Sequence, residues 1–558
     1  MFWYFLILGI IFVFICSVIA WGLAKYMTYV FADDSRPSIV TNKILNSFLI
    51  SPHEQHWRDY LISLLVFNLF GFIALFAILW FQDLLPWNPR DFGAMNPYLI
   101  FHTAASFVTN TNLQAYVPET NLSYFSQSVG LVVQHFLSAA TGACVGVALI
   151  RGFAREGSIT IGNFWSDMVR CVVFILLPVC ILTAALFIKQ GMPQNLNDYI
   201  AAQNYLIPQG PVASQTAIKI FGGNGGGFFA ANAAHPYENP SLMSNYLQLA
   251  LILIFPMSFI FLLGNFLKKP QEAMVLYAAV TILFLINFAV VLHGELSSAA
   301  WLSSGLTENV VYEGKELMPG ILGSAMWDVS TTATANGSAN MAVASQNSLS
   351  IFIMLLQMNL GEVFYGGVGT GFCTLILLAL LSVFVGTLMI GRSPEYLSKK
   401  IEVFEIKAVM IALLIMPVFL FSGLGLVLLD PDVKTYILNT GPMGFTEIFY
   451  AYSSAAANNG SALNGFMMND SVVLATLGMM MLAGRFLPIV ALIIISGHLA
   501  AKKKLQPSIA TLTTASPTFL FMLCFMIVIL GLLTYFPLLT LGPLTDYLGT
   551  IMPIAGGK

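Results

Sequence analysis

Long apolar runs recur along the whole chain and are separated by polar loops. A helix needs about 20 mostly apolar residues to cross a bilayer, and ten segments meet that length: 2–24, 59–82, 125–152, 166–188, 243–267, 272–293, 349–390, 405–429, 471–500 and 516–540. The seventh run is too long for one crossing and contains Gly366, Gly367, Gly369 and Gly371, which predicts a broken helix. The pattern therefore predicts an all-α polytopic membrane protein with ten transmembrane helices.

Four of the loops carry a second, shorter pattern. In each, an apolar segment of about ten residues, too short to span a bilayer, precedes a Gly/Asn/Thr-rich turn. The short segments are 98–108, 213–221, 321–330 and 444–452, and the turns follow at 109–112, 222–227, 331–337 and 453–460. Non-helical backbone at membrane depth is tolerated where it lines a water-filled path or is buried in protein. Four matching turns therefore predict one cation pathway lined by backbone carbonyls, which replace the hydration shell of a potassium-sized ion.

The order of these features is an internal repeat. It predicts four copies of helix, pore half-helix, filter turn and helix in a pseudo-fourfold arrangement, with an extra helix at each end. The predicted parts are an N-terminal transmembrane helix and cytoplasmic loop (1–56), pore repeat 1 (57–155), pore repeat 2 (156–269), pore repeat 3 with the broken helix (270–402), pore repeat 4 (403–504) and a C-terminal transmembrane helix (505–558).

Charge is scarce and unevenly placed. Only 9% of the residues are charged and 58% are hydrophobic, which excludes a soluble enzyme with a single anchor. Most of the 23 Lys and Arg residues fall in loops that share one side of the predicted membrane, so both termini are expected outside the cytoplasm. The chain has no extended basic surface for nucleic acid, no transition-metal ligand spacing and no paired carboxylates, so we expect no catalytic centre and no organic cofactor.

Two ionisable residues lie inside apolar runs. Glu362 and Arg485 would be costly in lipid, so they are expected to face the protein interior or water. They belong either to the conduction region, with Arg485 a barrier against leak, or to a structural ion pair, or their charged ends reach a membrane interface. The glycine-rich break at 366–371 is likewise either a gate beneath the turns or a packing kink.

Several segments resemble one known family. They are 107–112 with Gln114, 210–214, 224–229, 235–240, 361–369, 389–397 and 453–460. Over essentially the whole chain the sequence is similar to the A subunits of the bacterial Kdp potassium-transporting ATPases, within the superfamily of potassium transporters. The resemblance implies that K⁺ is the transported ion, and that it is selected from outside by four filter turns: Asn110, Thr111 and Asn112; Gly223, Asn224 and Gly225; Ala335, Asn336 and Gly337; Asn458, Asn459 and Gly460.

The resemblance also implies partners and a location. A P-type ATPase subunit (KdpB) would bind and hydrolyse ATP, beside a small single-span subunit (KdpC) and a short membrane peptide (KdpF), in the bacterial cytoplasmic (inner) membrane. This chain itself has no D-K-T-G sequence and no G-x-x-x-x-G-K-[ST] loop. In the family, ions leave sideways near the glycine-rich break, and affinity is sensitive at the position of Gln114. Gly223 and Ala335-Asn336 depart from the family pattern, which bears on affinity more than on ion identity.

One alternative function stays open at this point. A stand-alone potassium channel or ion-coupled symporter of the same four-repeat architecture would share every filter feature. The additional first and tenth helices and the family-like segments favour the ATPase subunit.

Overall fold

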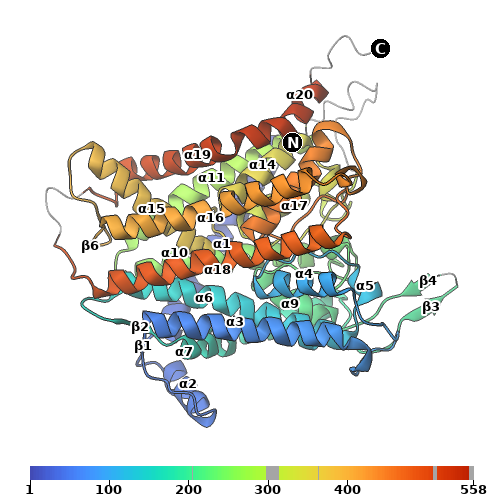
Figure 1. Cartoon of the computed structure of the whole chain (residues 1–558), viewed down its shortest axis with the longest axis horizontal. Coiled ribbons are helices and arrows are strands. Elements are labelled where there is room, and N and C mark those ends of the chain that lie inside the picture. The colour runs from blue at the N-terminus through green and yellow to red at the C-terminus, as the bar shows by residue number, and fades with distance from the viewer. Residues whose placement is uncertain (204, 297–312, 362, 507–511, 552–558) are drawn as a thin grey trace.

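The computed structural model describes residues 1–203, 205–296, 313–361, 363–506 and 512–551. Its long helices run side by side along the length of the molecule (Figure 1). Ten helical segments of the described chain are long and apolar enough to cross a membrane: α1 (Phe2–Val30), α3 (Trp57–Trp80), η2 joined to α6 (Ser126–Ala154), α7, η3 and α8 joined (Phe164–Gln190), α10 (Leu242–Leu267), α11 (Pro270–Leu296), α15 (Thr370–Met389), α16 (Val403–Leu428), α18 (Ser471–Ala501) and α19 (Pro517–Leu539) with its continuation. The predicted all-α polytopic fold is confirmed.

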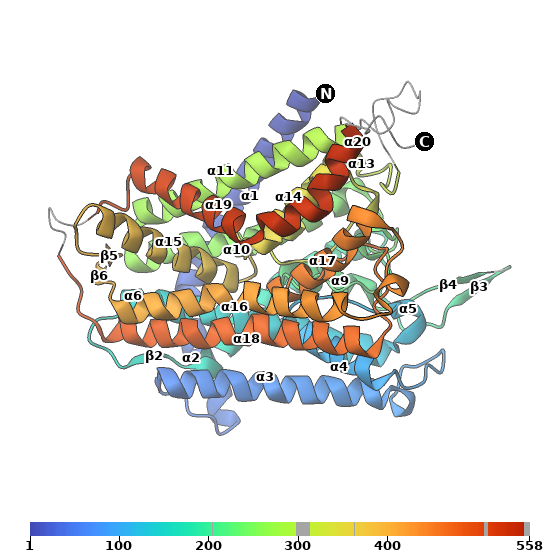
Figure 2. The same ribbon diagram turned by 45° about the horizontal axis from the view of Figure 1, so that its top comes forward.

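The four short apolar segments form the predicted half-helices. They are α4 (Pro97–Val108), α9 (Val212–Phe221), α13 (Gly320–Ala333) and α17 (Gly441–Ala457). These helices lie towards one end of the molecule, the end at which α1 begins and α20 (Thr545–Ile551) lies (Figures 1 and 2).

The remaining elements are short connections. The helical ones are α2 (Arg36–Ser47), η1 (Gln82–Leu84), α5 (Pro118–Asn121), η4 (Asn232–Ala234), η5 (Val343–Ser345), η6 (Val433–Thr435) and η7 (Thr540–Leu544). Within the described ranges, three antiparallel pairs of strands are formed by β1 (Gln55–His56) with β2 (Thr160–Gly162), β3 (Ile200–Ala202) with β4 (Tyr205–Ile207), and β5 (Glu395–Tyr396) with β6 (Lys399–Lys400). The β3–β4 hairpin projects away from the helices at the half-helix end (Figure 2).

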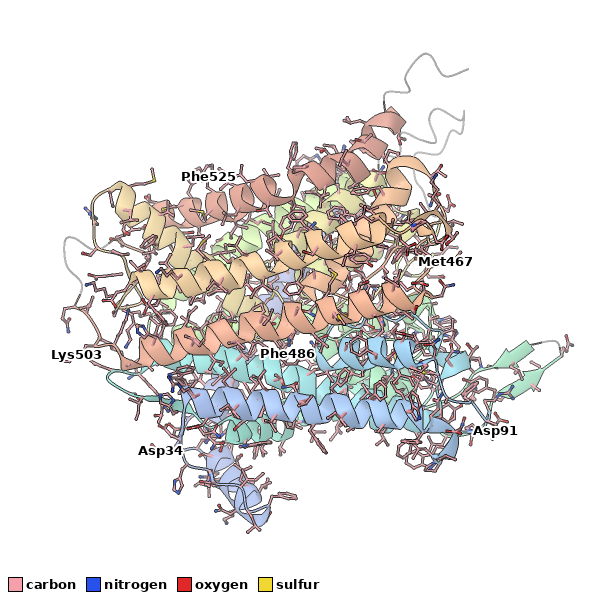
Figure 3. All side chains as sticks on the ribbon, in the orientation of Figure 1. Asp34, Asp91, Met467, Phe486, Lys503 and Phe525 are labelled. Atoms are coloured by element: carbon pink, nitrogen blue, oxygen red, sulfur yellow. The ribbon has the colours of Figure 1, made fainter. Side chains whose placement is uncertain are left out.

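Burial separates central helices from peripheral ones. In α6 and α10, 89% of the apolar stretch is buried, whereas the values for α1 and α3 are 28% and 22%. Helices that are apolar on every side and exposed on one of them fit a lipid environment. Figure 3 shows Phe486 and Phe525 midway along the helices, with Lys503 at one end and Asp91 and Met467 at the other.

The seventh apolar run is broken, as predicted, but the break differs in extent. Helix α14 (Ser348–Asn359) ends before an irregular segment that is described over 360–361 and 363–369, and α15 begins at Thr370. Three of the four glycines lie in this loop, whereas Gly371 belongs to the first turn of α15. Glycine is common within membrane helices, so composition alone does not show where the loop ends and the helix begins.

A buried ion pair fastens α6 to α7 (Phe164–Arg170) at the end opposite the half-helices. Arg151 donates to both carboxylate oxygens of Asp167, over 2.6 Å and 2.9 Å. The Tyr60 hydroxyl donates to the same carboxylate at 3.1 Å. The Arg151 and Asp167 side chains are only 6% and 1% exposed, so each charge is neutralised by the other and has little contact with water.

We expect Arg151→Met to destabilise the chain by about 3–5 kcal/mol, because the substitution leaves the buried Asp167 carboxylate without its cation. The double variant Arg151→Met/Asp167→Asn should recover most of that loss. Thermal unfolding of the purified protein measures both effects. Equal unfolding temperatures for the single variant and the unmodified chain would show that the pair does not stabilise this end.

Candidate ion-binding site

The four turns that follow the half-helices share one backbone conformation. In each turn the first and third residues have positive φ and the middle residue does not. The φ values are 62° and 72° at Asn110 and Asn112, 67° and 80° at Gly223 and Gly225, 52° and 73° at Ala335 and Gly337, and 60° and 104° at Asn458 and Gly460. Residues of positive φ that alternate with residues of ordinary φ change the direction of successive peptide groups, so that carbonyl oxygens can point to one side of the chain. This is the arrangement needed to present rows of backbone polar atoms.

Each turn is closed by the same hydrogen bond. The amide of the middle residue donates to the carbonyl five residues earlier, inside the last turn of the half-helix. The bonds are Thr111 N to Ser106 O (2.8 Å), Asn224 N to Lys219 O (3.0 Å), Asn336 N to Thr331 O (3.1 Å) and Asn459 N to Ser454 O (2.9 Å). Each turn is therefore fixed to the C-terminal end of a helix, which carries partial negative charge.

Side chains link the turns into a closed ring. Asparagine amides join neighbouring repeats around the ring, with acceptors in a turn or at the end of a half-helix. The bonds are Asn110 Nδ2 to Gly223 O (3.1 Å), Asn336 Nδ2 to Ile220 O of α9 (3.3 Å), Asn459 Nδ2 to Thr331 O of α13 (3.0 Å) and Asn458 Nδ2 to Thr111 Oγ1 (2.9 Å). The partners are more than 100 residues apart in sequence. The repeats therefore enclose one common axis.

Close backbone approach explains three glycines of the ring. A Cβ atom on Gly225 would lie 1.8 Å from the Asn336 carbonyl oxygen, and one on Gly460 would lie 1.8 Å from that of Thr111. A Cβ on Gly337 would lie 2.3 Å from the Asn459 oxygen. Only glycine combines positive φ with such contacts. The first turn carries Asn112 at this place, so the ring is not fourfold symmetric in its side chains.

Gln114 connects the first turn to the segment after the second. Its Oε1 accepts from the Gly227 amide at 3.0 Å, and its Nε2 donates to the Gly227 carbonyl at 3.2 Å. The Gln114 side chain thus bonds both the backbone N–H and the backbone C=O of Gly227, which belongs to the neighbouring repeat.

The glycine-rich loop lies directly against the ring. The Gly366 amide donates to Ala333 O at 2.8 Å, and Ala333 lies two residues before the filter residue Ala335. A Cβ on Gly369 would lie 2.0 Å from the Gly142 carbonyl oxygen, so this part of the loop touches α6 closely. Tyr365 has a φ of 77° and donates to Thr281 Oγ1 at 3.0 Å, which fastens the loop to α11. A bulky residue in a left-handed conformation marks a strained backbone at this point.

A cavity of about 200 Å³ connects the ring to this loop. It is lined by Ala335 and Asn458 of the ring, by Gly367 and Thr370, and by Arg485. Arg485 is 6% exposed and donates through Nη1 to Thr370 Oγ1 at 2.8 Å. The predicted conduction residue Arg485 therefore lies beneath the ring, whereas Glu362 falls outside the described residues.

Sequence reasoning missed three residues next to these features. Tyr365 lies inside the glycine-rich loop and Thr370 begins α15, but neither residue carries a charge or a repeat signature. Lys219 lies in one of the short apolar segments between two predicted spans, and its side chain is fully buried in α9. An ionisable residue inside a short apolar helix was the signal that could have identified it.

The fold and the ring define a class of membrane protein that resembles known potassium transporters in architecture. The solved structure of the potassium transporter TrkH from Vibrio parahaemolyticus has a TM-score of 0.52 to this chain, at 15% sequence identity, and the match covers 88% of this chain and 97% of that one. At this identity the likeness concerns the fold alone.

The particular family follows from sequence. The chain belongs to the family of potassium-transporting ATPase A subunits (KdpA), whose profile matches residues 10–548. It is 44% identical over 539 residues to the potassium-transporting ATPase potassium-binding subunit of Rhodospirillum centenum, covering 94% of each chain. It is 45% identical over 505 residues to the protein of the same name from Mesorhizobium japonicum, covering 89% of each.

Proposed function

We propose that this chain binds K⁺ in the ring of four turns and passes it into the cavity beneath, as the channel-like subunit of an ATP-driven potassium uptake complex. The observation that carries the proposal is the closed ring of half-helix ends with one repeated backbone conformation. Helix C-termini and converging carbonyls favour a dehydrated monovalent cation. The twelve ring residues are the proposed ion-binding residues, with Gln114 as a support.

The glycine-rich loop is the proposed gate. Gly366 and Gly369 join it to the third half-helix and to α6, and Gly367 lines the cavity. An ion leaving the ring meets this loop and the Arg485 guanidinium before it can continue. We infer that the loop and Arg485 together prevent free passage along the axis.

The complex and its orientation belong to the same proposal. A partner P-type ATPase subunit hydrolyses ATP, and this chain contributes no catalytic centre. The ring faces the outside of the bacterial inner membrane, with both termini on that side, because the basic segment around Lys503 lies at the opposite end (Figure 3). The proposed repeat boundaries are those expected from the sequence, since each contains one half-helix and one turn.

The test is ATP hydrolysis by the membrane complex purified through a tag on this chain and titrated with K⁺, with Na⁺ as the control. We expect stimulation by K⁺ alone at micromolar to millimolar concentration. If no ATPase co-purifies and the reconstituted chain passes K⁺ down its gradient unaided, the protein is a stand-alone channel or symporter instead.

Replacement of Gln114 is expected to weaken K⁺ binding. Gln114→Leu removes two hydrogen bonds to Gly227. Each bond is worth about 0.5–1.5 kcal/mol, or about fivefold, so the half-saturating K⁺ concentration should rise by about 25-fold. The exposed Gln506 at the opposite end gives the matched control, Gln506→Leu, which should leave that concentration unchanged. Identical titrations of the two variants would remove Gln114 from the site.

A further inference from the structure

The second turn differs from the other three in the residue behind it. The carbonyl that closes each turn belongs to Ser106, Thr331 and Ser454 in repeats one, three and four, and to Lys219 in repeat two. Three repeats thus place a short hydroxyl side chain here, and one places an ammonium group. The repeat itself provides the comparison that makes Lys219 exceptional.

The Lys219 ammonium is fully enclosed and has two partners. It forms an ion pair with Glu238, and both side chains are 0% exposed. It also donates to Asn232 Oδ1 at 2.8 Å. The paired Glu238 accepts the Phe229 amide at 2.8 Å, which fixes the chain just beyond the turn.

Asn232 carries this network to the ring. Its Nδ2 donates to the carbonyl of Gly225 at 2.7 Å. The amide of Gly225 in turn donates to the backbone carbonyl of Lys219 at 2.8 Å. Lys219 therefore fixes both backbone polar groups of Gly225. Its backbone carbonyl accepts the Gly225 N–H, and its side chain acts through Asn232 on the Gly225 C=O.

In the fourth turn, a different group accepts the amide of the third residue. There the amide of Gly460, which corresponds to Gly225, donates to the Ser454 hydroxyl at 2.8 Å. Gly225 and Gly460 both pack against a carbonyl of the next turn, so a small shift of either changes the ring. A buried ion pair is poor evidence for stability, but it can specify a unique conformation.

We propose that the buried Lys219–Glu238 pair, acting through Asn232, is a positioning unit that fixes the second turn and thereby sets the preference of the ring for K⁺ over Rb⁺. The inference rests on the proposed function, because it assigns the ring as the ion-binding site. Lys219 and Glu238 act on the ion through Gly225 and are not themselves ligands.

The test measures the half-saturating concentrations of K⁺ and of Rb⁺ for ATP hydrolysis by the purified complex. Asn232→Ala keeps the ion pair but removes the amide that joins Lys219 to Gly225. Lys219→Met/Glu238→Gln removes both charges together. Loss of one ordinary hydrogen bond to a ring residue corresponds to about a fivefold change, so we expect the Rb⁺-to-K⁺ ratio to change by about fivefold in each variant at a near-normal maximal rate.

The control is another buried ion pair, which lies far from the ring. Arg151→Met/Asp167→Asn should keep the unmodified ratio, which separates a positioning effect from general weakening of the protein. An unchanged ratio in Asn232→Ala at a normal maximal rate overturns the inference, even if the double variant does not assemble. Absence of K⁺ stimulation in the unmodified complex would instead overturn the proposed function.

Discussion

Gly225→Ala is expected to raise the half-saturating K⁺ concentration by about 100-fold. The new Cβ atom would lie 1.8 Å from the Asn336 carbonyl oxygen and 2.8 Å from the Ser338 amide nitrogen, both backbone atoms of the next turn. Overpacking of this kind costs about 1–3 kcal/mol, and a non-glycine residue at positive φ adds about 1–2 kcal/mol. The two costs sum to about 2–5 kcal/mol, and 1.4 kcal/mol corresponds to a factor of ten in affinity, so a rise of about 100-fold lies within this range.

The measurement is K⁺-stimulated ATP hydrolysis over a wide concentration range. Because the clash changes the ring and not the ATPase, high K⁺ should restore the maximal rate. Gly425→Ala is the control, since a Cβ atom on Gly425 of α16 would meet nothing within 4 Å and this variant should titrate normally. A normal titration of Gly225→Ala would contradict the assignment of the second turn to the ion site.

Local elements of the fold were predictable from the sequence, whereas tertiary contacts were not. The ten spans and four half-helices were predictable because apolar length and Gly/Asn turn chemistry are local properties of the sequence. The location of the turns followed from the fourfold repetition of weak signals. Ala335 was predictable as a turn residue even though its φ of 52° is unfavourable for alanine, because its neighbours fit the repeat.

Contacts between repeats were not predictable. The bond from Asn110 to Gly223 joins residues 113 positions apart, and nothing in the local pattern identifies the pair. The buried pair of Lys219 with Glu238 was not predictable either, because the sequence around Glu238 is typical of a polar, exposed loop. The end of the glycine-rich break was misjudged at Gly371, because glycine suits both the loop and the start of α15.

Replacement of Arg485 is expected to have the second large effect, an increase in ion leak, because its positive charge lies beneath the ring. The guanidinium lines the cavity next to Ala335 and Asn458 and is 6% exposed. At an effective dielectric constant of about 20, a unit charge about 8 Å from a cation opposes it by about 2 kcal/mol. Such a charge is a barrier to any K⁺ ion that would pass through the ring without coupling to ATP.

Arg485→Gln should therefore raise ATP-independent Rb⁺ flux through the reconstituted complex by about 30-fold, the factor that corresponds to 2 kcal/mol. Arg485→Lys is the matched variant: it keeps the positive charge but loses the planar fork that reaches Thr370, so flux should stay low. Leak in both variants would assign the effect to the hydrogen bond that holds the loop. Low flux in both would show that Arg485 serves packing of α18 against the loop, because then neither its charge nor its bond controls passage.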